Sequence, residues 1–481
     1  MNKEKTIGWN FDNSYSNLPK SFIYEISPVP VKRPELVIFN HDLADQMGLN
    51  FSNVDNEQLA KMFSGNLLPK GSKSLAQAYA GHQFGHFTML GDGRAVLLGE
   101  HISKSNQRLD IQFKGSGQTP FSRNGDGRAA LGPMLREYLI SEAMYSLNIP
   151  TTRSLAVVKT GENVIREKPL QGAILTRVAS SHIRVGTFQF IRTRENLDEL
   201  NTLVNYTIKR HYPEISKSKN NAYDLLSKLI DKQIELVVNW MRVGFIHGVM
   251  NTDNMAISGE TIDYGPCAFM DSYNLGTCFS SIDHMGRYAY GNQPAITKWN
   301  LARFAECLLT LINPNKDDAL KMATELIDKF DKIYEEKWFN MMKSKLGLIG
   351  DYKEDNLIIF ELLEIMKKQE LDYTNTFLFL MDHEIDDKKS YQNEEFDNWK
   401  MKWQKRLTKD SKNLMELNNP VIIPRNHNVE NVLKSAENND LTPFNDLLQA
   451  LKNPYTNQKV LNKYQSPPPK SDEKYQTFCG T

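Results

Sequence analysis

The chain has 481 residues, of which 40% are hydrophobic, so it can form a large bilobal domain or two ordinary domains with a sizeable core. Its 58 basic and 58 acidic residues balance, which provides no excess positive charge for binding nucleic acid or a membrane surface. No run approaches the roughly 20 apolar residues of a membrane-spanning helix, and the first residues lack a signal-peptide pattern, so we expect a cytoplasmic protein.

Residues 1–75 mix short apolar runs with prolines and predict an irregular segment leading into the fold. Strands are then predicted at 94–99 and 109–114, and the first is entered through a Gly-Asp-Gly turn. In the second, apolar Leu109, Ile111 and Phe113 alternate with polar residues, which is typical of a half-buried strand.

After a turn-rich stretch, an i, i+4 apolar stripe predicts a helix over 131–147. Strand-like segments follow, and from residue 223 the sequence becomes mainly helical, with a strong stripe that ends before Gly244. The strand-like segments are 155–159 and 173–178, and the later helices are predicted at 297–312, 317–345, 355–368 and 395–416. The Pro-rich tail is expected to be exposed and extended.

Strands first and helices afterwards are the order of an α+β fold with the two lobes of a protein kinase. We expect three parts: an N-terminal extension with a nucleotide-binding N-lobe over 1–185, a helical catalytic C-lobe over 186–465, and an extended tail over 466–481.

A loop with two glycines, Gly91 and Gly93, precedes the first strand. Backbone N–H groups in such a loop can approach phosphates, and the adjacent Arg94 can hold a phosphate through two donors. A simple hairpin turn is the common alternative for this pattern.

Lys114 lies on the polar face of the second strand, where a kinase lysine reaches the nucleotide phosphates. A solvated lysine is the ordinary alternative. The following helix carries Glu137, the predicted ion-pair partner of Lys114, and Glu142, which we expect to be a surface carboxylate.

A second Gly-Asp-Gly contains Asp126 and Gly127, and it indicates either a helix start or, with Arg128, an anion site. Arg177 and Arg184 are either phosphate ligands or surface charges. Together with the strand lysine, these two arginines would suit a polyphosphate held deep in a pocket.

The segment HGVMNTDNMAISGETIDYGP begins at His247 and keeps the His and Asn spacing of a kinase catalytic loop, but Val249 replaces the catalytic aspartate. Asp253 is the only carboxylate of the loop and is the predicted general base. Asn254 and Asp263 are hard oxygen ligands that suit Mg²⁺ or Mn²⁺. The alternative is that the Asp-Asn pair only forms a turn, and we expect the histidine to be structural.

Four cysteines, at 267, 278, 307 and 479, are too few and too unevenly spaced for a disulfide framework or a zinc site. Idle thiols are the ordinary interpretation. Cys479 is different, because it lies near the end of the tail.

Together these residues resemble the selenoprotein O family, called YdiU in bacteria. The blocks AYAGHQFGHFTMLGDGRAVLLGE, DIQFKGSGQTPFSRNGDGRAALGPMLREYLISEAM, IPTTRSLAVV and FIHGVMNTDNMAISGETIDYGP look like its signatures, and NPVIIPRNHNVENVL fits too. The resemblance covers nearly the whole chain. It implies a protein-kinase-like fold that binds ATP in an inverted orientation and transfers AMP to Ser, Thr or Tyr hydroxyls of proteins. Some bacterial members are also described as transferring UMP from UTP, with manganese.

The resemblance also implies roles for individual residues. Asp253 would accept the proton, and Asn254 and Asp263 would bind Mg²⁺ or Mn²⁺. Nucleotide contacts are implied for Gly91, Gly93, Arg94, Lys114, Asp126, Gly127, Arg177, Arg184 and Asp263. If the γ-phosphate faces the three cations at 114, 177 and 184, the metal is left beside the α-phosphorus, and attack there expels pyrophosphate.

In this family the C-terminal cysteine is linked to redox control through a bond to a cysteine of the activation-loop region. For Cys479 we favour Cys278 as the partner, with Cys267 as the alternative; the ending FCGT lacks the usual Ser-Ser. The expected partners are therefore target proteins, without nucleic acid or membrane. Phosphotransfer and non-catalytic nucleotide binding remain alternative functions.

Overall fold

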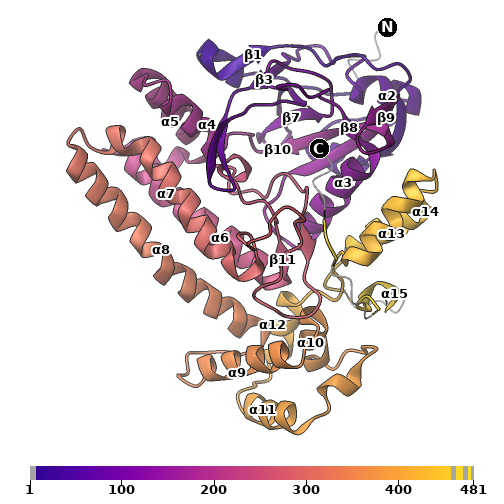
Figure 1. Ribbon diagram of the computed structural model, residues 1–481, viewed down its shortest axis with the longest axis vertical. Helices are drawn as coiled ribbons and strands as arrows, with labels where there is room; N and C mark the ends of the chain where they lie inside the picture. The colour runs from indigo at the N-terminus through magenta and orange to yellow at the C-terminus, as the bar shows by residue number, and fades with distance from the viewer. Residues whose placement is uncertain (1–6, 457–461, 470–474, 478–481) are drawn as a thin grey trace.

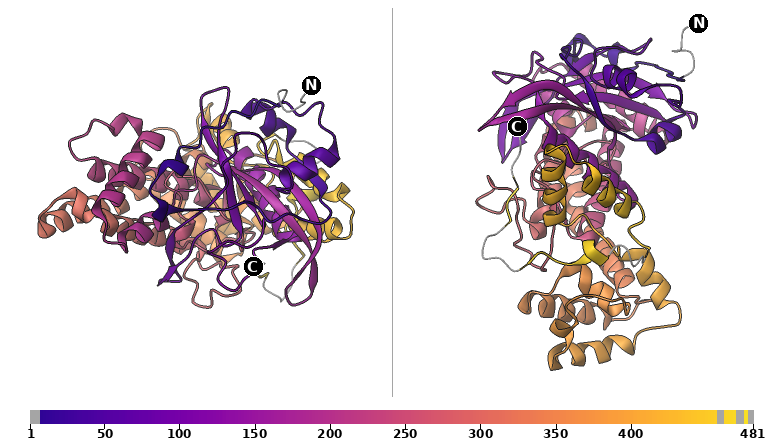
Figure 2. Two further views of the ribbon diagram at one scale, coloured as in Figure 1. Left: turned by 90° about the horizontal axis from the view of Figure 1, so that it is seen from above. Right: turned by 90° about the vertical axis from the view of Figure 1, so that its right-hand side faces the viewer.

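The computed structural model describes residues 7–456, 462–469 and 475–477. The N-terminal part contains the main sheet and the C-terminal part is helical, which confirms the predicted mixed α and β composition and its order along the chain. Figure 2 shows the sheet at one end of the elongated molecule, with the helices extending away from it. Among the described residues, none of the helices has the length and apolar character needed to cross a bilayer.

An eight-stranded antiparallel sheet dominates the N-terminal part. Its spatial order is β1 (Ile23–Glu25), β3 (Leu75–Gln77), β6 (Ala95–Ile102), β7 (Arg108–Lys114), β10 (Pro169–Ala179), β9 (Arg153–Ile165) and β2 (Glu35–Phe39), and β8 (Ala129–Ala130) pairs with β10. The register places Arg177 opposite Gln112. Opposed residues share a face of the sheet, and so do residues two apart on one strand, so Lys114 lies on the same face as both.

The prediction of an irregular segment over 1–75 is wrong. This segment contains β1, β2 and the first residue of β3, and two short helices, α1 (His41–Met47) and α2 (Asn56–Phe63). Asn40 and Asp55 cap these helices through their side chains, and their apolar faces cover the sheet. Helices of two turns are too short to present a long apolar stripe, so the pattern did not reveal them.

Strand β7 is buried on both faces, so the prediction of a half-buried strand is wrong. Its apolar residues, such as Ile111 and Phe113, pack in the core with α2. On the polar face, Asp110 forms an ion pair with Arg210 at 2.7 Å and a hydrogen bond with His182 at 2.9 Å. The polar face can be buried because its charges are paired. An alternating sequence pattern does not distinguish a buried polar face of this kind from one that is exposed to water.

Helix α3 (Leu131–Ser146) follows the sequence prediction and packs against β9 and β10. The remaining helices are α4 (Val185–Arg192), α5 (Leu197–His211), α6 (Asn221–Val243), α7 (Gln293–Ile312), α8 (Lys316–Lys345), α9 (Asp355–Lys368), α10 (Tyr373–Leu380), α11 (Glu394–Gln404), α12 (Ser411–Asn418), α13 (Asn426–Glu437), α14 (Thr442–Leu451) and α15 (Asn462–Gln465). Helix α6 ends just before Gly244, as predicted. Gly244 caps the helix with a φ of 72°, in the left-handed region that glycine adopts easily.

The single helix predicted over 395–416 is wrong, because the chain forms α11 and α12 instead. In the break between them, the Ser411 hydroxyl accepts a hydrogen bond from the Thr408 backbone N–H at 2.9 Å. The same hydroxyl donates to the carbonyl of Gly347 at 2.6 Å. Hydroxyl side chains that bind backbone groups in this way compete with a continuous helix.

Helices α13 and α14 return to the N-terminal part and lie beside α3 (Figure 1). One hydrophobic core joins residues of α3, β10, α6, α13 and α14. Two small sheets stand apart from the main sheet: β4 (Ala80–Gln83) pairs with β5 (His86–Met89), and β11 (Phe245–Ile246) pairs with β12 (Ala268–Phe269). The segment between β11 and β12 contains the kinase-like motif.

The tail was predicted to be exposed, and at Thr477 this is wrong. Thr477 is 4% exposed and forms a parallel bridge with Ser280. Its hydroxyl donates to the carbonyl of Pro266 at 2.7 Å, and its backbone N–H donates to the carbonyl of Phe279 at 2.7 Å. The tail therefore contacts the segment that follows the kinase-like motif.

Candidate active site

A cleft of about 620 Å³ lies between the main sheet and the segment joining β11 to β12. It is lined by every residue predicted to bind nucleotide or metal or to act as the base: Gly91, Gly93, Arg94, Lys114, Asp126, Gly127, Arg177, Arg184, Asp253, Asn254 and Asp263. The end of β7 supplies Lys114 and β10 supplies Arg177, while Arg184 directly precedes α4. Tertiary folding thus brings together residues from widely separated motifs.

Three cations surround one carboxylate deep in this cleft. Oδ1 of Asp263 lies 2.7 Å from Lys114 Nζ and 2.5 Å from Arg177 Nη2, and its Oδ2 lies 3.1 Å from Arg184 Nη1. Burial opposes ionisation of Asp263, but Arg177, Lys114 and Arg184 outweigh it, and the pKa of this carboxyl lies well below its ordinary value. Glu137 forms ion pairs with two of these cations: its carboxylate lies 2.6 Å from Lys114 and 2.7 Å from Arg177.

Neither arginine of this group is a surface charge, since Arg177 is 2% exposed and Arg184 is 4% exposed. Glu142 is not a surface carboxylate either. Its side chain is 12% exposed, pairs with Arg153 at 2.6 Å and accepts a hydrogen bond from Asn40 at 2.9 Å. It therefore stabilises the outer side of α3, while Glu137 faces the cleft.

The backbone of Asp263 adopts an uncommon conformation. Its φ is +64°, in the left-handed region that non-glycine residues rarely occupy. The preceding residue, Ile262, accepts a hydrogen bond at its carbonyl from Nε2 of the buried His247, at 2.9 Å. This histidine supports the loop, and strain of this kind is concentrated at functional sites.

Asp253 lies in a 3₁₀ turn formed by Thr252–Asn254, and it is 7% exposed. Its Oδ1 is buried and has no hydrogen-bond partner in the described part of the chain. Burial raises the pKa of the carboxyl to about 6, although Arg184 acts in the opposite direction. The neighbouring Asn254 donates its amide to the carbonyl of Val249 at 2.9 Å, which leaves its oxygen available.

Sequence reasoning missed the hairpin of β4 and β5, which covers Asp253. A Cβ at Gly81 would lie 2.1 Å from Oδ1 of Asp253, so only glycine permits this approach. Tyr79, just before the hairpin, places its ring 4.5 Å from Cζ of Arg184. The glycine within a β-strand pattern is the signal that could have indicated such a close approach.

The glycine loop before β6 is not a hairpin turn, because β5 and β6 belong to different sheets. Gly91 has a φ of +138°, and a Cβ there would lie 2.4 Å from Cγ of Phe121. The second glycine motif does not begin a helix. Helix α3 starts later, after Ala130, and Asp126 instead pairs with Arg166 at 2.9 Å, which lowers the pKa of this carboxyl.

The charge of the cleft favours a polyanion. Seven of its lining residues are Arg or Lys and four are Asp, although the whole chain has no net charge. No cluster of three His, Cys, Asp or Glu side chains that could hold a metal occurs in the described ranges. The two candidate ligands, Asn254 and Asp263, with the unpartnered Oδ1 of Asp253 beside them, instead suit a cation that also binds substrate phosphates.

Of the predicted redox residues, Cys278 lies in the segment that the tail contacts, and its Sγ is 3.4 Å from Oδ2 of Asp283. Cys267, the alternative partner, is fully buried, and burial raises the pKa of its thiol to about 11. Cys479 lies outside the described residues.

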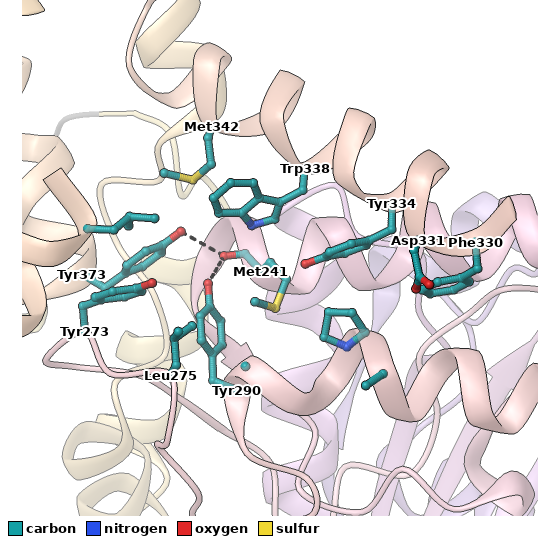
Figure 3. A pocket seen from close by; sticks show the side chains of 14 residues that line it. Met241, Tyr273, Leu275, Tyr290, Phe330, Asp331, Tyr334, Trp338, Met342 and Tyr373 are labelled. Carbon is teal, nitrogen blue, oxygen red and sulfur yellow. Dashed lines mark hydrogen bonds between the residues drawn. The ribbon is translucent and has the colours of Figure 1, made fainter. Parts of the chain in front are cut away.

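A second cavity, of about 380 Å³, lies in the helical part and contains none of the predicted site residues (Figure 3). Six of its fourteen lining residues are aromatic, and the hydroxyls of Tyr290 and Tyr373 both donate to the carbonyl of Met241, at 2.7 and 3.0 Å. Its one ionic lining residue, Asp331, is acidic and pairs with Lys298. This cavity therefore does not suit a polyphosphate.

Comparison with known proteins adds independent information. The family described as "Protein adenylyltransferase SelO" matches residues 5–452. Three similar relatives bear the name "Protein nucleotidyltransferase YdiU". They come from Pelagibacter ubique (64% identical, covering 99% of this chain and 100% of the relative), Nitrosococcus oceani (55%, 100% and 99%) and Bacillus thuringiensis (55%, 100% and 100%).

Proposed function

The chain belongs to the protein adenylyltransferase SelO family, and we propose that it transfers AMP from ATP to Ser, Thr or Tyr hydroxyls of proteins, releasing pyrophosphate. It is a protein nucleotidyltransferase, in agreement with the names of relatives that match its whole length. Transfer of UMP from UTP is a second activity of the same chemistry. For the fold, we propose the two lobes of a protein kinase, over 1–185 and 186–465, with a tail over 466–481.

The observation that carries the proposal is the position of Asp253 relative to the cation cluster. Arg184 links the two, because its Nη1 is 2.9 Å from the carbonyl oxygen of Asp253 and 3.1 Å from Oδ2 of Asp263. Arg184 thus connects Asp253, whose carboxylate has an unpartnered oxygen, to a cluster of cations that attracts polyphosphate.

The roles of the residues follow from this arrangement. Lys114, Arg177 and Arg184 bind the β- and γ-phosphates and stabilise the charge that develops on the leaving group. Asp253 accepts the proton of the target hydroxyl, whose oxygen forms a bond to the α-phosphorus. The bond between the α-phosphorus and the bridging oxygen breaks, and its electron pair leaves with pyrophosphate.

Asn254 and Asp263 would hold the divalent cation, Mg²⁺ or Mn²⁺, which supplies Lewis-acid neutralisation of phosphate charge when bound. Asp263 is ion-paired to the three cations here. Phosphates entering the cleft would compete for these cations and release the carboxylate for the metal. Gly91, Gly93, Arg94, Asp126 and Gly127 complete the proposed nucleotide contacts from the loops at the cleft wall.

The test is mass spectrometry of proteins incubated with the enzyme, Mg²⁺ or Mn²⁺, and either ATP or UTP. A mass gain of one adenylyl or uridylyl group on a Ser, Thr or Tyr side chain supports the proposal. A gain of one phosphate would instead support phosphotransfer, the main alternative. Asp253→Asn protein, treated identically, identifies modification that does not depend on this active site.

A further inference from the structure

A pair of arginines lies on the outer side of the hairpin that covers Asp253. The guanidinium carbons of Arg287 and Arg303 are 4.9 and 5.1 Å from the ring centroid of Trp299, on α7. His82, on β4, completes the group, with its ring 5.2 Å from Trp299 at an interplanar angle of 89°. We refer to these four residues as the arginine–tryptophan site.

The charge of this site is incompletely neutralised. Arg303 pairs with Glu306 at 2.7 Å, whereas the side chain of Arg287 lies over the ring of Tyr288 and forms no ion pair within the described ranges of the chain. The Nε atoms of both arginines are buried and have no hydrogen-bond partner among the described residues. Burial, together with Arg303 and Arg287, lowers the pKa of His82, so this histidine adds no charge of its own. The site therefore carries excess positive charge.

Direct contacts connect the site to the catalytic loop. His82 donates its backbone N–H to the hydroxyl of Thr252, the residue before Asp253, at 2.7 Å. Tyr288, next to Arg287, packs on Phe84 with ring centroids 5.1 Å apart, and donates its hydroxyl to Asn251 at 2.7 Å. The arginine–tryptophan site and the catalytic loop are thus linked through the hairpin and through Tyr288.

The surroundings are those of a protein-binding surface. Three large apolar side chains are exposed on the two segments that frame the site: Phe87 (45%) on the hairpin, and Ile282 (56%) and Met285 (93%) before Arg287. Phe87 contacts the ring of His82, with centroids 5.2 Å apart, and Ile282 lines the cleft itself. Exposed apolar groups beside stacked arginines favour contact with a polypeptide.

We propose that the arginine–tryptophan site binds an acidic side chain of the target protein, a few residues from the hydroxyl that is modified. A carboxylate can accept two parallel hydrogen bonds from a guanidinium, and stacking on Trp299 holds both guanidinium planes in place. The inference rests on the proposed function, because it assigns a preferred target sequence to the same reaction.

The experiment uses positional-scanning peptide pools, each with one central Ser, Thr or Tyr and either Glu, Gln or Lys fixed at one other position. Binding to the full chain is measured by fluorescence anisotropy, and nucleotidyl transfer by radiolabel from ATP. We expect roughly tenfold tighter binding of the Glu pool at one position. Arg287→Gln should reduce this Glu-to-Gln ratio to about one, and Arg287→Glu should reverse it in favour of a Lys pool.

Arg33→Gln is the matched control, since it removes an exposed arginine on a distant edge of the main sheet and should leave the ratio unchanged. Equal binding of Glu and Gln pools by the wild-type chain at every position would overturn the inference, and so would an unchanged ratio in both Arg287 variants. Binding and transfer separate the two proposals. A Glu preference in binding without nucleotidyl transfer refutes the proposed function alone, and transfer without a Glu preference refutes this inference alone.

Discussion

Nζ of Lys114 lies 2.7 Å from Oδ1 of Asp263, although 149 positions separate the two residues in the chain. This contact joins the main sheet to the kinase-like motif between β11 and β12. Glu137, on α3, holds the same lysine from the other side at 2.6 Å. The geometry of the cleft therefore depends on a charge network to which sheet, helix and loop all contribute.

Glu137→Gln should destabilise the protein by about 3 kcal/mol, because it leaves the buried Lys114 and Arg177 with one carboxylate fewer. Chemical denaturation would measure the loss. We expect ATP to stabilise this variant more than the wild type, since phosphates can replace the missing negative charge. Glu142→Gln is the control on the same helix: its loss of stability should not depend on ATP. An equal effect of ATP on Glu137→Gln and wild type would contradict the proposed phosphate contacts.

Asp253→Asn should lower the rate of nucleotidyl transfer at least about 100-fold, because the amide cannot accept the hydroxyl proton. The substitution keeps the shape of the side chain, so ATP binding measured by calorimetry should persist. Asp231→Asn, at an exposed position of α6, should change neither property. Transfer at the wild-type rate by Asp253→Asn would show that another group is the base.

The pH dependence of transfer follows from Asp253, whose pKa burial raises to about 6. The base must be ionised, so kcat/KM should fall about tenfold per unit as pH decreases below 6. Because the folded pKa lies above the ordinary value of 3.8, protonation of this residue stabilises the fold as pH falls between these two values. Loss of activity in this range would therefore not reflect unfolding caused by Asp253.

Two variants test the assignment of this profile. Arg184 lowers the pKa of Asp253, so Arg184→Gln should move the midpoint of the profile to higher pH. Asp92 is also buried with a pKa raised to about 6, and Asp92→Asn should leave the midpoint unchanged if Asp253 controls it. If Asp92→Asn removed the decrease in kcat/KM near pH 6, the titration would belong to Asp92 instead.

Metal binding can be tested through nucleotide affinity as well as activity. Removal of divalent cations by a chelator should stop transfer. In calorimetry, Mg²⁺ or Mn²⁺ should increase the affinity of the wild type for ATP and should have little effect on Asn254→Ala, which lacks the amide oxygen. The affinity for ATP without metal should be similar in the two proteins. An undiminished metal effect in the variant would exclude Asn254 as a ligand.

The redox prediction concerns Cys278 and Cys479. Thr477 of the tail contacts both Phe279, one residue beyond Cys278, and Pro266, one residue before Cys267, but Cys267 is fully buried. Cys278→Ser and Cys479→Ser should therefore each remove any difference in activity between oxidising and reducing buffer. Cys267→Ser should retain the difference. Mass spectrometry of unreduced peptides would identify the bonded pair, and a Cys267–Cys479 peptide would refute our choice.

Local patterns predicted the long elements of this protein well. The apolar stripes of α3 and α6 predict both helices almost to the residue, because each helix is long enough for its pattern to repeat over many turns. Short capped helices, such as α1 and α2, were missed, because two turns provide too few positions for a periodic signal. The break between α11 and α12 depends on a hydroxyl bond to a distant turn, which no local pattern encodes.

The sequence by itself determined which chemical groups are available: the proposed base, the proposed metal ligands and the cations at 114, 177 and 184 are recognisable from their motifs. Only the tertiary structure decided how they are paired, that both faces of β7 are buried, and that Gly81 lets a hairpin approach Asp253. The physical reason is that burial and ion pairing depend on distances between segments far apart in the chain. A motif specifies a side chain, whereas the fold specifies its neighbours and hence its charge state.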